Sequence, residues 1–241
     1  MFQNSRFMVS LVRRLLAIFA IILIALATLA QQNDSTIPTP EWIQANIDSL
    51  RSTLLTNKKV PDKYEHSILA ALMYYPDLEE TRITFKAKPI TTTMAAFPRP
   101  LSLFRKRENR HYAIVINERK NRRKAPLIKN VPFDARVGVF GHELAHIADY
   151  QEQNTLQIIG MGIAYALSNR YKQKVEYKID KTTINRGLGK GLLAFRQYVE
   201  EEEKTTERYR KFKEKIYMSS EEISQIIEGL NNLASEENNG D

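Results

Sequence analysis

Two of the four histidines in this chain of 241 residues stand four positions apart, in the segment His142-Glu143-Leu144-Ala145-His146. Residues four apart on a helix lie on one face, one turn above the other, so His142 and His146 can direct two imidazole nitrogens at one metal ion. Glu143 stands beside the first histidine, where its carboxylate can reach a water molecule at that metal. Two ligands, a general base and an open coordination position are the parts of a catalytic zinc site.

The residues around the motif predict the helix that this arrangement needs. Apolar residues recur at steps of four and three: Phe133, Val137, Phe140, Leu144 and Ile147. They predict a stripe that packs on the core, while His142, His146 and Asp149 fall on another side of the helix. The alternative interpretation is a buried helix whose histidines only form hydrogen bonds.

A catalytic zinc site normally has three protein ligands, and this chain has no cysteine to supply the third. Glu152 stands where the metzincin pattern has its third ligand, but Asp149 replaces the glycine at which that pattern leaves the helix. We therefore expect the helix to continue and to point Glu152 away from the metal. We favour Glu176. Asp180 follows it by four residues on the same helix face and can accept the free ring N–H of a ligand histidine.

The two motifs together resemble those of the gluzincins. HELAH followed by Glu176-Tyr177-Lys178-Ile179-Asp180 is most similar to the branch of CAAX prenyl proteases and heat-shock membrane proteases, whose second helix carries E-x-x-A-D. The resemblance implies zinc ligands at His142, His146 and Glu176. It also implies a general base at Glu143 and a supporting carboxylate at Asp180.

The resemblance covers residues 140–180 only. Ile179 replaces the small residue that usually precedes the aspartate, and the chain lacks the multi-span membrane region of that branch. The resemblance therefore concerns the catalytic core and says little about the substrate. The fold that we expect is α+β and zincin-like, mostly helical with a small mixed sheet beside the HExxH helix.

Two segments predict strands: residues 81–90, where apolar and polar residues alternate, and residues 112–117, which are rich in β-branched residues. An edge strand beside the active helix of a zincin-type fold pairs with an extended substrate. Residues 111–117 are the candidate for that strand, and an ordinary internal strand is the alternative. Residues 156–167 are apolar but too few to span a bilayer, and we predict a buried helix behind the active helix.

Residues 1–30 have the pattern of a secretory signal. Arg6, Arg13 and Arg14 precede an uncharged apolar run, residues 15–30, and Ala30 offers a cleavage point before a polar segment. The alternative is an uncleaved N-terminal membrane anchor. Residues 31–234 form the predicted zinc metallopeptidase domain, and residues 235–241 a frayed tail. The chain is then exported, and is periplasmic, secreted or held at the membrane through residues 15–30.

The composition is basic, with 36 Lys and Arg against 28 Asp and Glu, a formal charge of +8. Basic residues cluster at 105–110 and 119–124. These clusters can attract an acidic partner or a lipid headgroup surface, and the simpler interpretation is a solvated loop. No interleaved aromatic residues or helix-turn-helix pattern indicates nucleic acid as a partner. The absence of cysteine excludes thiol nucleophiles and disulfides.

The sequence thus predicts an exported zinc-dependent metallopeptidase that cleaves a peptide or protein substrate, with Glu143 as general base. Tyr150, His111, Arg186 and Tyr209 are candidates for the group that stabilises the oxyanion. Two alternatives stay open: a zinc-binding, non-catalytic envelope protein that serves as a binding or assembly module, and a structural envelope protein whose motif is coincidental.

Overall fold

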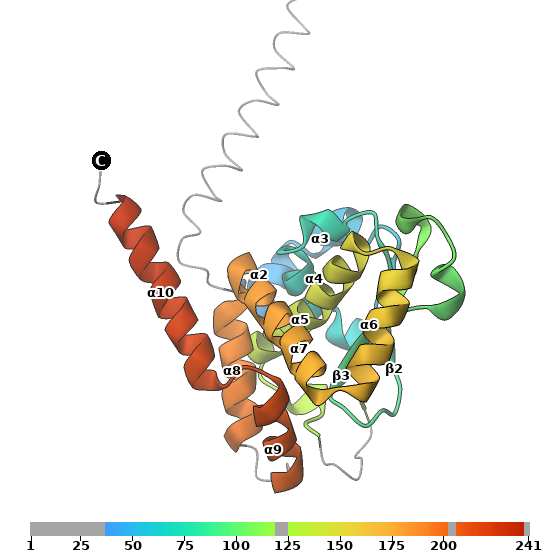
Figure 1. The fold of residues 1–241 in the computed structure, drawn as a ribbon. Helices are drawn as coiled ribbons and strands as arrows, with labels where there is room; N and C mark the ends of the chain where they lie inside the picture. Colours follow the sequence, from blue (N-terminus) through green and yellow to red (C-terminus); the bar gives the residue numbers. More distant parts are fainter. Residues whose placement is uncertain (1–36, 119–124, 202–205, 239–241) are drawn as a thin grey trace, which may run out of the picture. The chain divides into compact units, whose positions relative to one another are not determined.

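The computed structural model describes residues 37–118, 125–201 and 206–238, which fold mostly as helices around a small sheet (Figure 1). The helices are α2 (Pro40–Ala45), α3 (Ile47–Leu54), α4 (Glu65–Leu72), α5 (Phe133–Glu152), α6 (Thr155–Leu167), α7 (Asn169–Thr183), α8 (Gly189–Glu201), α9 (Glu207–Ile216) and α10 (Ser220–Asn238). The strands are β1 (Lys58–Lys59), β2 (Arg82–Ala87), β3 (Met94–Pro98) and β4 (His111–Ile116). The α+β class with its small mixed sheet agrees with the prediction.

The sheet has the strand order β1-β2-β4-β3, in which β1, β2 and β4 are parallel and β3 is antiparallel to β4. β4 is therefore an internal strand. The prediction that residues 111–117 form an edge strand for a substrate is wrong. Residues Tyr112 to Ile116 are all buried, as expected of a strand covered on both faces and paired on both sides. The described sheet has β1 at one edge and β3 at the other, and β3 is paired with β4 from Met94–Ile116 to Pro98–Tyr112.

The HExxH helix α5 lies inside the protein, between α4, α7, α8 and strand β3 (Figure 1). Every residue from Val137 to Asp149 is buried, including the predicted apolar stripe from Val137 to Ile147. Gly138 allows a very close approach to α8: a Cβ atom there would lie 2.1 Å from the carbonyl carbon of Gly191. The two helices thus cross with their backbones in contact, which brings α8 close to the HExxH motif.

The segment after α7 turns at a glycine. α7 ends at Thr183, and a single wide turn over residues 184–188 leads into α8. Gly187 in this turn has φ of 89°, a left-handed conformation that side chains other than glycine rarely adopt. This glycine breaks the helical path between α7 and α8, and the break lets α8 return along α5.

Helix α6 corrects another prediction. The sequence predicts a buried helix behind α5, but Ile158 is the only buried residue of α6, and Leu156 and Leu167 are 80% and 83% exposed. The prediction rests on hydropathy alone, and an apolar run does not show that the core of the domain covers the segment. The helix lies on the surface beside α7, toward the viewer in Figure 1.

The structure bears on only one end of the predicted domain. The signal or anchor segment, residues 1–30, lies outside the described residues. At the other end α10 continues to Asn238, past the point where a frayed tail was expected to begin at residue 235. Within the described part of the chain, no helix is long and apolar enough to cross a bilayer.

Candidate metal centre

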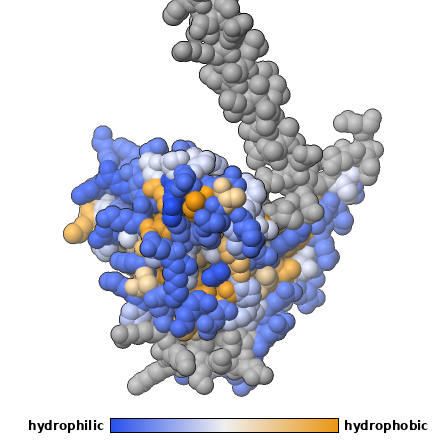
Figure 2. Space-filling model, turned by 180° about the vertical axis from the view of Figure 1, so that it is seen from behind, coloured by the Kyte–Doolittle hydropathy of each residue, from blue (hydrophilic) through white to orange (hydrophobic). Residues whose placement is uncertain are grey.

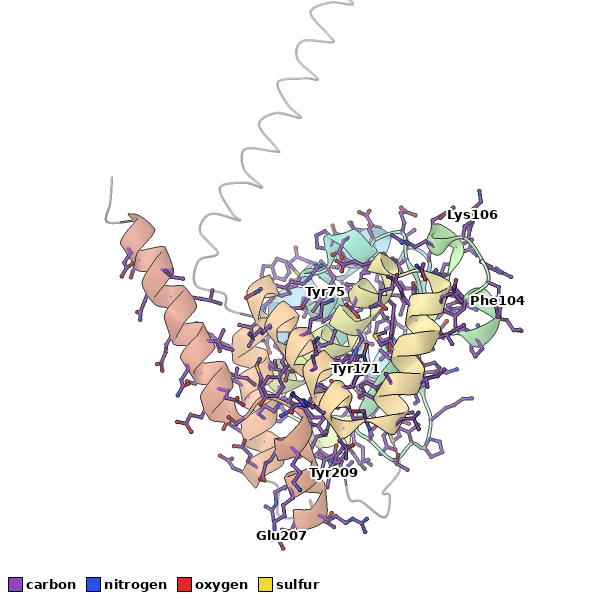
Figure 3. The ribbon with its side chains drawn as sticks, in the orientation of Figure 1. Tyr75, Phe104, Lys106, Tyr171, Glu207 and Tyr209 are labelled. Carbon is purple, nitrogen blue, oxygen red and sulfur yellow. The ribbon has the colours of Figure 1, made fainter. Side chains whose placement is uncertain are left out.

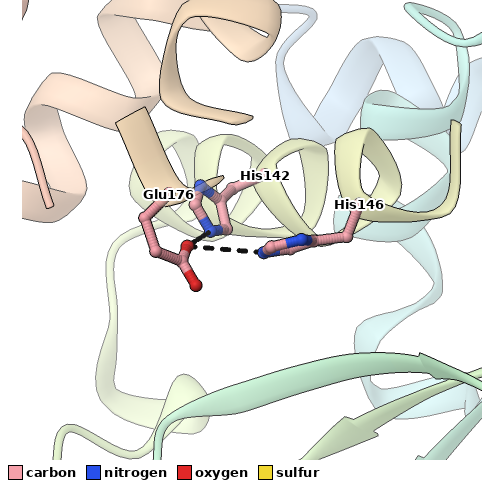
Figure 4. A group of neighbouring side chains, drawn as sticks. All are labelled: His142, His146 and Glu176. Carbon is pink, nitrogen blue, oxygen red and sulfur yellow. Dashed lines mark hydrogen bonds and ion pairs between the residues drawn. The ribbon is translucent and has the colours of Figure 1, made fainter. Parts of the chain in front are cut away.

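Three side chains meet where α5 and α7 face each other. His142 and His146 project from successive turns of α5, and Glu176 reaches them from α7 (Figure 4). The Nε2 atoms of His142 and His146 lie 3.1 Å and 3.4 Å from the same oxygen, Oε2 of Glu176. All three residues are buried, and within the described residues this is the group whose geometry could hold a metal ion.

The spacing of these atoms fits a metal bound between them. The ligand atoms of a tetrahedral zinc site lie about 2.0–2.1 Å from the ion, and therefore about 3.3–3.4 Å from one another. The two imidazole-to-carboxylate distances, 3.1 Å and 3.4 Å, are close to this value, and the three ligand atoms all lie within 4.8 Å of one another. Two histidines and one glutamate are also the ligand set of a group of catalytic zinc sites.

Asp180 supports the site from behind His142. Its Oδ1 lies 2.8 Å from Nδ1 of His142, so that the ring directs Nε2 toward Glu176. The same carboxylate accepts hydrogen bonds from Arg196 on α8, at 2.9 and 3.0 Å, and from the backbone N–H of Met218, at 3.1 Å. Asp180 is completely buried, and three donors from three different segments hold it in place.

The charges of the site balance one another. Burial by itself would lower the pKa of His142, but hydrogen bonds and charge from Asp180 and Glu176 raise that pKa to about 9. Burial opposes the ionisation of Glu176, yet the charge of His146 and the hydrogen bonds from both histidines hold its pKa well below the usual range. In the same way, burial opposes the ionisation of Asp180, but the charge of Arg196 lowers its pKa. The carboxylates are therefore anionic and favour a positive charge between them, supplied by a proton or by a metal ion.

Glu143 faces a cavity that His146 also lines. The cavity has a volume of about 430 Å³, and Glu143, His146 and Glu176 form its inner wall. Burial raises the pKa of Glu143, which is 6% exposed. A carboxylate in this position can take up a proton more readily than one in water, while it remains next to the two possible metal ligands.

The other walls of the cavity are mostly apolar. Strand β3 contributes all five of its residues, and α6 contributes Ile158, Ile159, Met161, Gly162 and Tyr165. The sequence predicts neither element at the site. β3 is short and ends in a proline, which weakens its strand pattern. The apolar sequence of α6 predicts a buried helix behind α5, whereas α6 forms a wall of the cavity.

The sequence does not predict two tyrosines of the site, Tyr165 and Tyr217. Tyr165 on α6 donates a short hydrogen bond to Oε1 of Glu176, which leaves Oε2 to face the imidazoles. Tyr217, between α9 and α10, packs its ring on His142 with the centroids 5.7 Å apart, and it lines the cavity. No spacing rule links these tyrosines to the HExxH motif, because the tertiary fold alone brings them there.

The rival ligand candidate does not take part. α5 continues through Glu152, as the missing glycine predicts, and Glu152 is exposed at the end of the helix. Asp149 turns to Lys178 of α7 and to Gln153. Lys178 follows Glu176 by two residues, so this ion pair joins α5 and α7 beside the possible metal site.

Of the four candidates for oxyanion stabilisation, Tyr150 alone lines the cavity. His111 lies between Thr84 and Arg99, Arg186 pairs with Asp77, and the hydroxyl of Tyr209 contacts Thr93. Tyr150 stacks on the ring of His146, with the centroids 6.3 Å apart. The histidine of α4, His66, is not part of the group either.

Comparison of the chain with protein-family models, with curated protein sequences and with solved structures gives no match.

Proposed function

We propose that this protein is a zinc-dependent metallopeptidase with a gluzincin-like site. The observation that carries the proposal is the convergence of His142, His146 and Glu176 next to Glu143 at the inner wall of a cavity. The ligand set favours zinc, because two imidazoles and one carboxylate with an open side form a common catalytic zinc site. The fold is then zincin-like, with α5 and α7 as the two ligand helices and β3 as the strand beside them.

A zinc ion held by these three residues would act as a Lewis acid and make a water molecule more acidic. Glu143 takes the proton of this water as the water attacks a peptide carbonyl, and then gives the proton to the leaving amine. Its burial, which raises its pKa, supports this transfer. Asp180 keeps His142 oriented through its Nδ1 atom, and Tyr165 does the same for Glu176.

The substrate of this reaction binds along β3. Its outer edge is not paired with another strand of the described sheet, and all its residues line the cavity. An extended peptide can therefore add to the sheet there through main-chain hydrogen bonds, which demand little of the peptide sequence. Tyr150 and Tyr217 line the same cavity, and burial raises the pKa of both, so that they remain protonated donors for the developing oxyanion.

The second candidate function is a zinc-binding module without catalysis, and the third interpretation is a metal-free structural protein. The third has its own support: a protonated His142 between Asp180 and Glu176 is a satisfied ion network even without a metal. Glu143 favours the peptidase over both, because this buried carboxylate at the cavity forms no ion pair with another described residue that would explain it as a structural group. Export, through the pattern of residues 1–30, remains part of the proposal.

Metal content distinguishes a zinc protein from a structural one. Purified protein, supplied with zinc and then dialysed, is analysed for bound metal by mass spectrometry. We expect one zinc ion per chain in the wild type, none in His146→Ala, and much weaker binding in Glu176→Gln. Glu152→Gln is the matched control, since it removes an exposed carboxylate from the same helix, and it should bind zinc as the wild type does. If the wild-type protein retained no zinc after dialysis, the proposed metal site would be refuted.

Cleavage distinguishes a peptidase from a binding module. The zinc-loaded chain is incubated with a mixture of unfolded peptides, and new termini are identified by mass spectrometry with and without a chelator. We expect cleavage by the wild type, and Glu143→Gln should keep its zinc but lose cleavage by a factor of about 10³ or more. Zinc binding without any cleavage would favour the module. Wild-type cleavage by Glu143→Gln would show that the base is a different group.

A further inference from the structure

Helix α6 is unusual for a surface helix because none of its 13 residues is charged. Leu156, Ile163 and Leu167 are 80%, 57% and 83% exposed, and only Ile158 is buried. A Cβ atom added at Gly160, four residues after Leu156, would meet nothing within 4 Å, so this face of the helix is open. An amphipathic surface helix normally presents charged residues to water, and α6 presents leucine, isoleucine and glycine.

A neighbouring loop extends this apolar surface. Leu101 and Phe104 are 88% and 79% exposed. The hydroxyl of Thr155, the first residue of α6, donates to the carbonyl of Leu103 at 2.7 Å, which fixes this loop against the start of the helix. Residues 101–104 and α6 therefore form one apolar surface, which we call the α6 face. The side of the molecule seen from behind is largely hydrophilic, with apolar areas between the hydrophilic ones (Figure 2).

Basic residues border the α6 face at both ends. Residues 105–107 follow Phe104 directly and are exposed, and Phe104 and Lys106 project outward at the edge of the molecule beside α6 (Figure 3). At the other end, Arg170 and Lys174 of α7 are exposed. None of these basic residues forms an ion pair with another described residue. Residues 154–175 contain no acidic residue, and Glu108 is the only one between residues 99 and 110.

We infer that the α6 face docks on an anionic lipid surface. An apolar face with a basic border is the pattern of a helix that lies in the headgroup region, with its apolar side chains in the acyl boundary and its cations on the phosphates. α6 lies along the surface and does not cross it, since 13 residues at about 1.5 Å each reach about 20 Å, less than the roughly 30 Å of a hydrocarbon core.

The border favours a membrane over a second copy of the chain. A two-fold symmetric contact through the α6 face would bring basic ends against basic ends, because both ends carry the same charge. Anionic lipid complements both ends at once. The inner side of α6 lines the cavity through Ile158, Met161 and Tyr165, so docking through the outer side of α6 places the cavity close to the lipid surface.

The test uses the full chain and a local probe. Residues 15–30 could by themselves hold the full chain on vesicles, so binding alone is not the readout. The chain has no cysteine, and single cysteines for the environment-sensitive dye bimane can therefore be introduced at Ile163 or Phe104. The exposed residues Thr53 and Gln225, on α3 and α10, provide the control positions. Vesicles are made of phosphatidylcholine with or without phosphatidylglycerol.

We expect the bimane emission at Ile163→Cys and Phe104→Cys to shift to the blue on vesicles with phosphatidylglycerol, and its quenching by aqueous iodide to fall. Labels at residues 53 and 225 should not respond. Unchanged emission at residue 163 on vesicle-bound protein would overturn the proposal. A blue shift that needs no vesicles and grows with protein concentration would overturn it too, because a second copy then covers the face. A shift of equal size without phosphatidylglycerol would refute the role of the basic border.

A charge on the face provides a second test. Leu167→Glu, in a chain labelled at residue 104, should abolish most of the blue shift. Leu233→Glu is the matched control, since Leu233 is also a largely exposed leucine, on α10, at 59% against 83%. Both substitutions are at exposed positions, where they should leave the fold intact. Equal blue shifts in the two variants would contradict docking through α6. Neither readout involves zinc or cleavage, so the result is independent of the proposed peptidase.

Discussion

Replacement of Asp180 by asparagine tests the geometry of the site most directly, because the shape of the side chain is nearly unchanged. Asp180 is completely buried and accepts hydrogen bonds from His142, from Arg196 and from the backbone N–H of Met218. Both carboxylate oxygens are used. Asparagine keeps one acceptor oxygen, and its NH₂ group would face one of these donors, so at least one buried donor loses its partner.

The substitution should lower two quantities: the stability of the metal-free protein and its affinity for zinc. Removal of one partner from a buried ion pair, here with Arg196, costs about 3–5 kcal/mol, a large part of the roughly 5–15 kcal/mol by which a domain is stable. Loss of the carboxylate that orients a ligand histidine lowers metal affinity by about 10–100-fold. We therefore expect Asp180→Asn to be strongly destabilised without metal and to bind zinc about 10–100-fold more weakly.

The assay combines urea denaturation of the metal-free protein, followed by circular dichroism, with zinc titration against a competing chelator. Asp77→Asn is the control, because Asp77 also pairs with an arginine, Arg186, but is 44% exposed. An exposed pair is worth about 0–1 kcal/mol, so this variant should unfold and bind zinc much as the wild type does. If Asp180→Asn matched Asp77→Asn in both measurements, the support of His142 by Asp180 would be refuted.

Three further predictions concern the helices and the protons around the site. Gly138→Ala should destabilise the protein by about 1–3 kcal/mol or more in denaturant unfolding, because the added Cβ atom meets the backbone of α8. Gly160→Ala is the control: its Cβ atom meets nothing within 4 Å, and it should stabilise α6 by up to about 1 kcal/mol. Since the pKa of His142 is raised to about 9, its proton stabilises the metal-free fold fully below pH 6.5, and this contribution is lost as the pH rises through 9. Bound zinc replaces that proton, so the rise in melting temperature on zinc addition should grow from pH 6.5 to pH 9. A rise that is the same at both pH values would contradict the competition between the proton and zinc. Tyr165→Phe removes the hydrogen bond to Oε1 of Glu176. It should weaken zinc binding by about 10-fold in a chelator titration and leave kcat at saturating zinc unchanged. A lower kcat with unchanged zinc affinity would instead make Tyr165 a catalytic residue.

The sequence predicts the parts of the site that depend on helix periodicity. The apolar stripe from Val137 to Ile147 predicts α5, and the four-residue spacing places His142 and His146 on one face of it. The spacing of Glu176 and Asp180 likewise predicts that the two carboxylates share a face of α7, and the structure turns that face toward α5. Local periodicity is enough for such predictions because it acts within one helix.

The parts that the sequence does not predict depend on contacts between distant segments. The sequence predicts β4 as an edge strand, but β3 pairs with it, and β3 is an alanine-rich strand with little pattern of its own. The sequence predicts α6 as a buried helix because its hydropathy is that of a core helix. Tyr217 reaches His142 from 75 positions away. In each case the tertiary contacts of the segment decide its role, and the local pattern of a single sequence does not show which distant segments will be in contact.

The position of Asp180 relative to His142 is set by a third helix that carries no ligand. Arg196 of α8 holds both oxygens of Asp180, and Gly191 of the same helix lies against Gly138 of α5, where no side chain keeps the two backbones apart. α8 is thus fixed to the helix of the histidines at one point and to the carboxylate of α7 at another. A small change in the distance between α5 and α8 would move Arg196 and, with it, Asp180. The proposed zinc site therefore depends on two glycines and an arginine that no metal-binding motif contains, which is why Gly138→Ala should lower zinc affinity as well as stability.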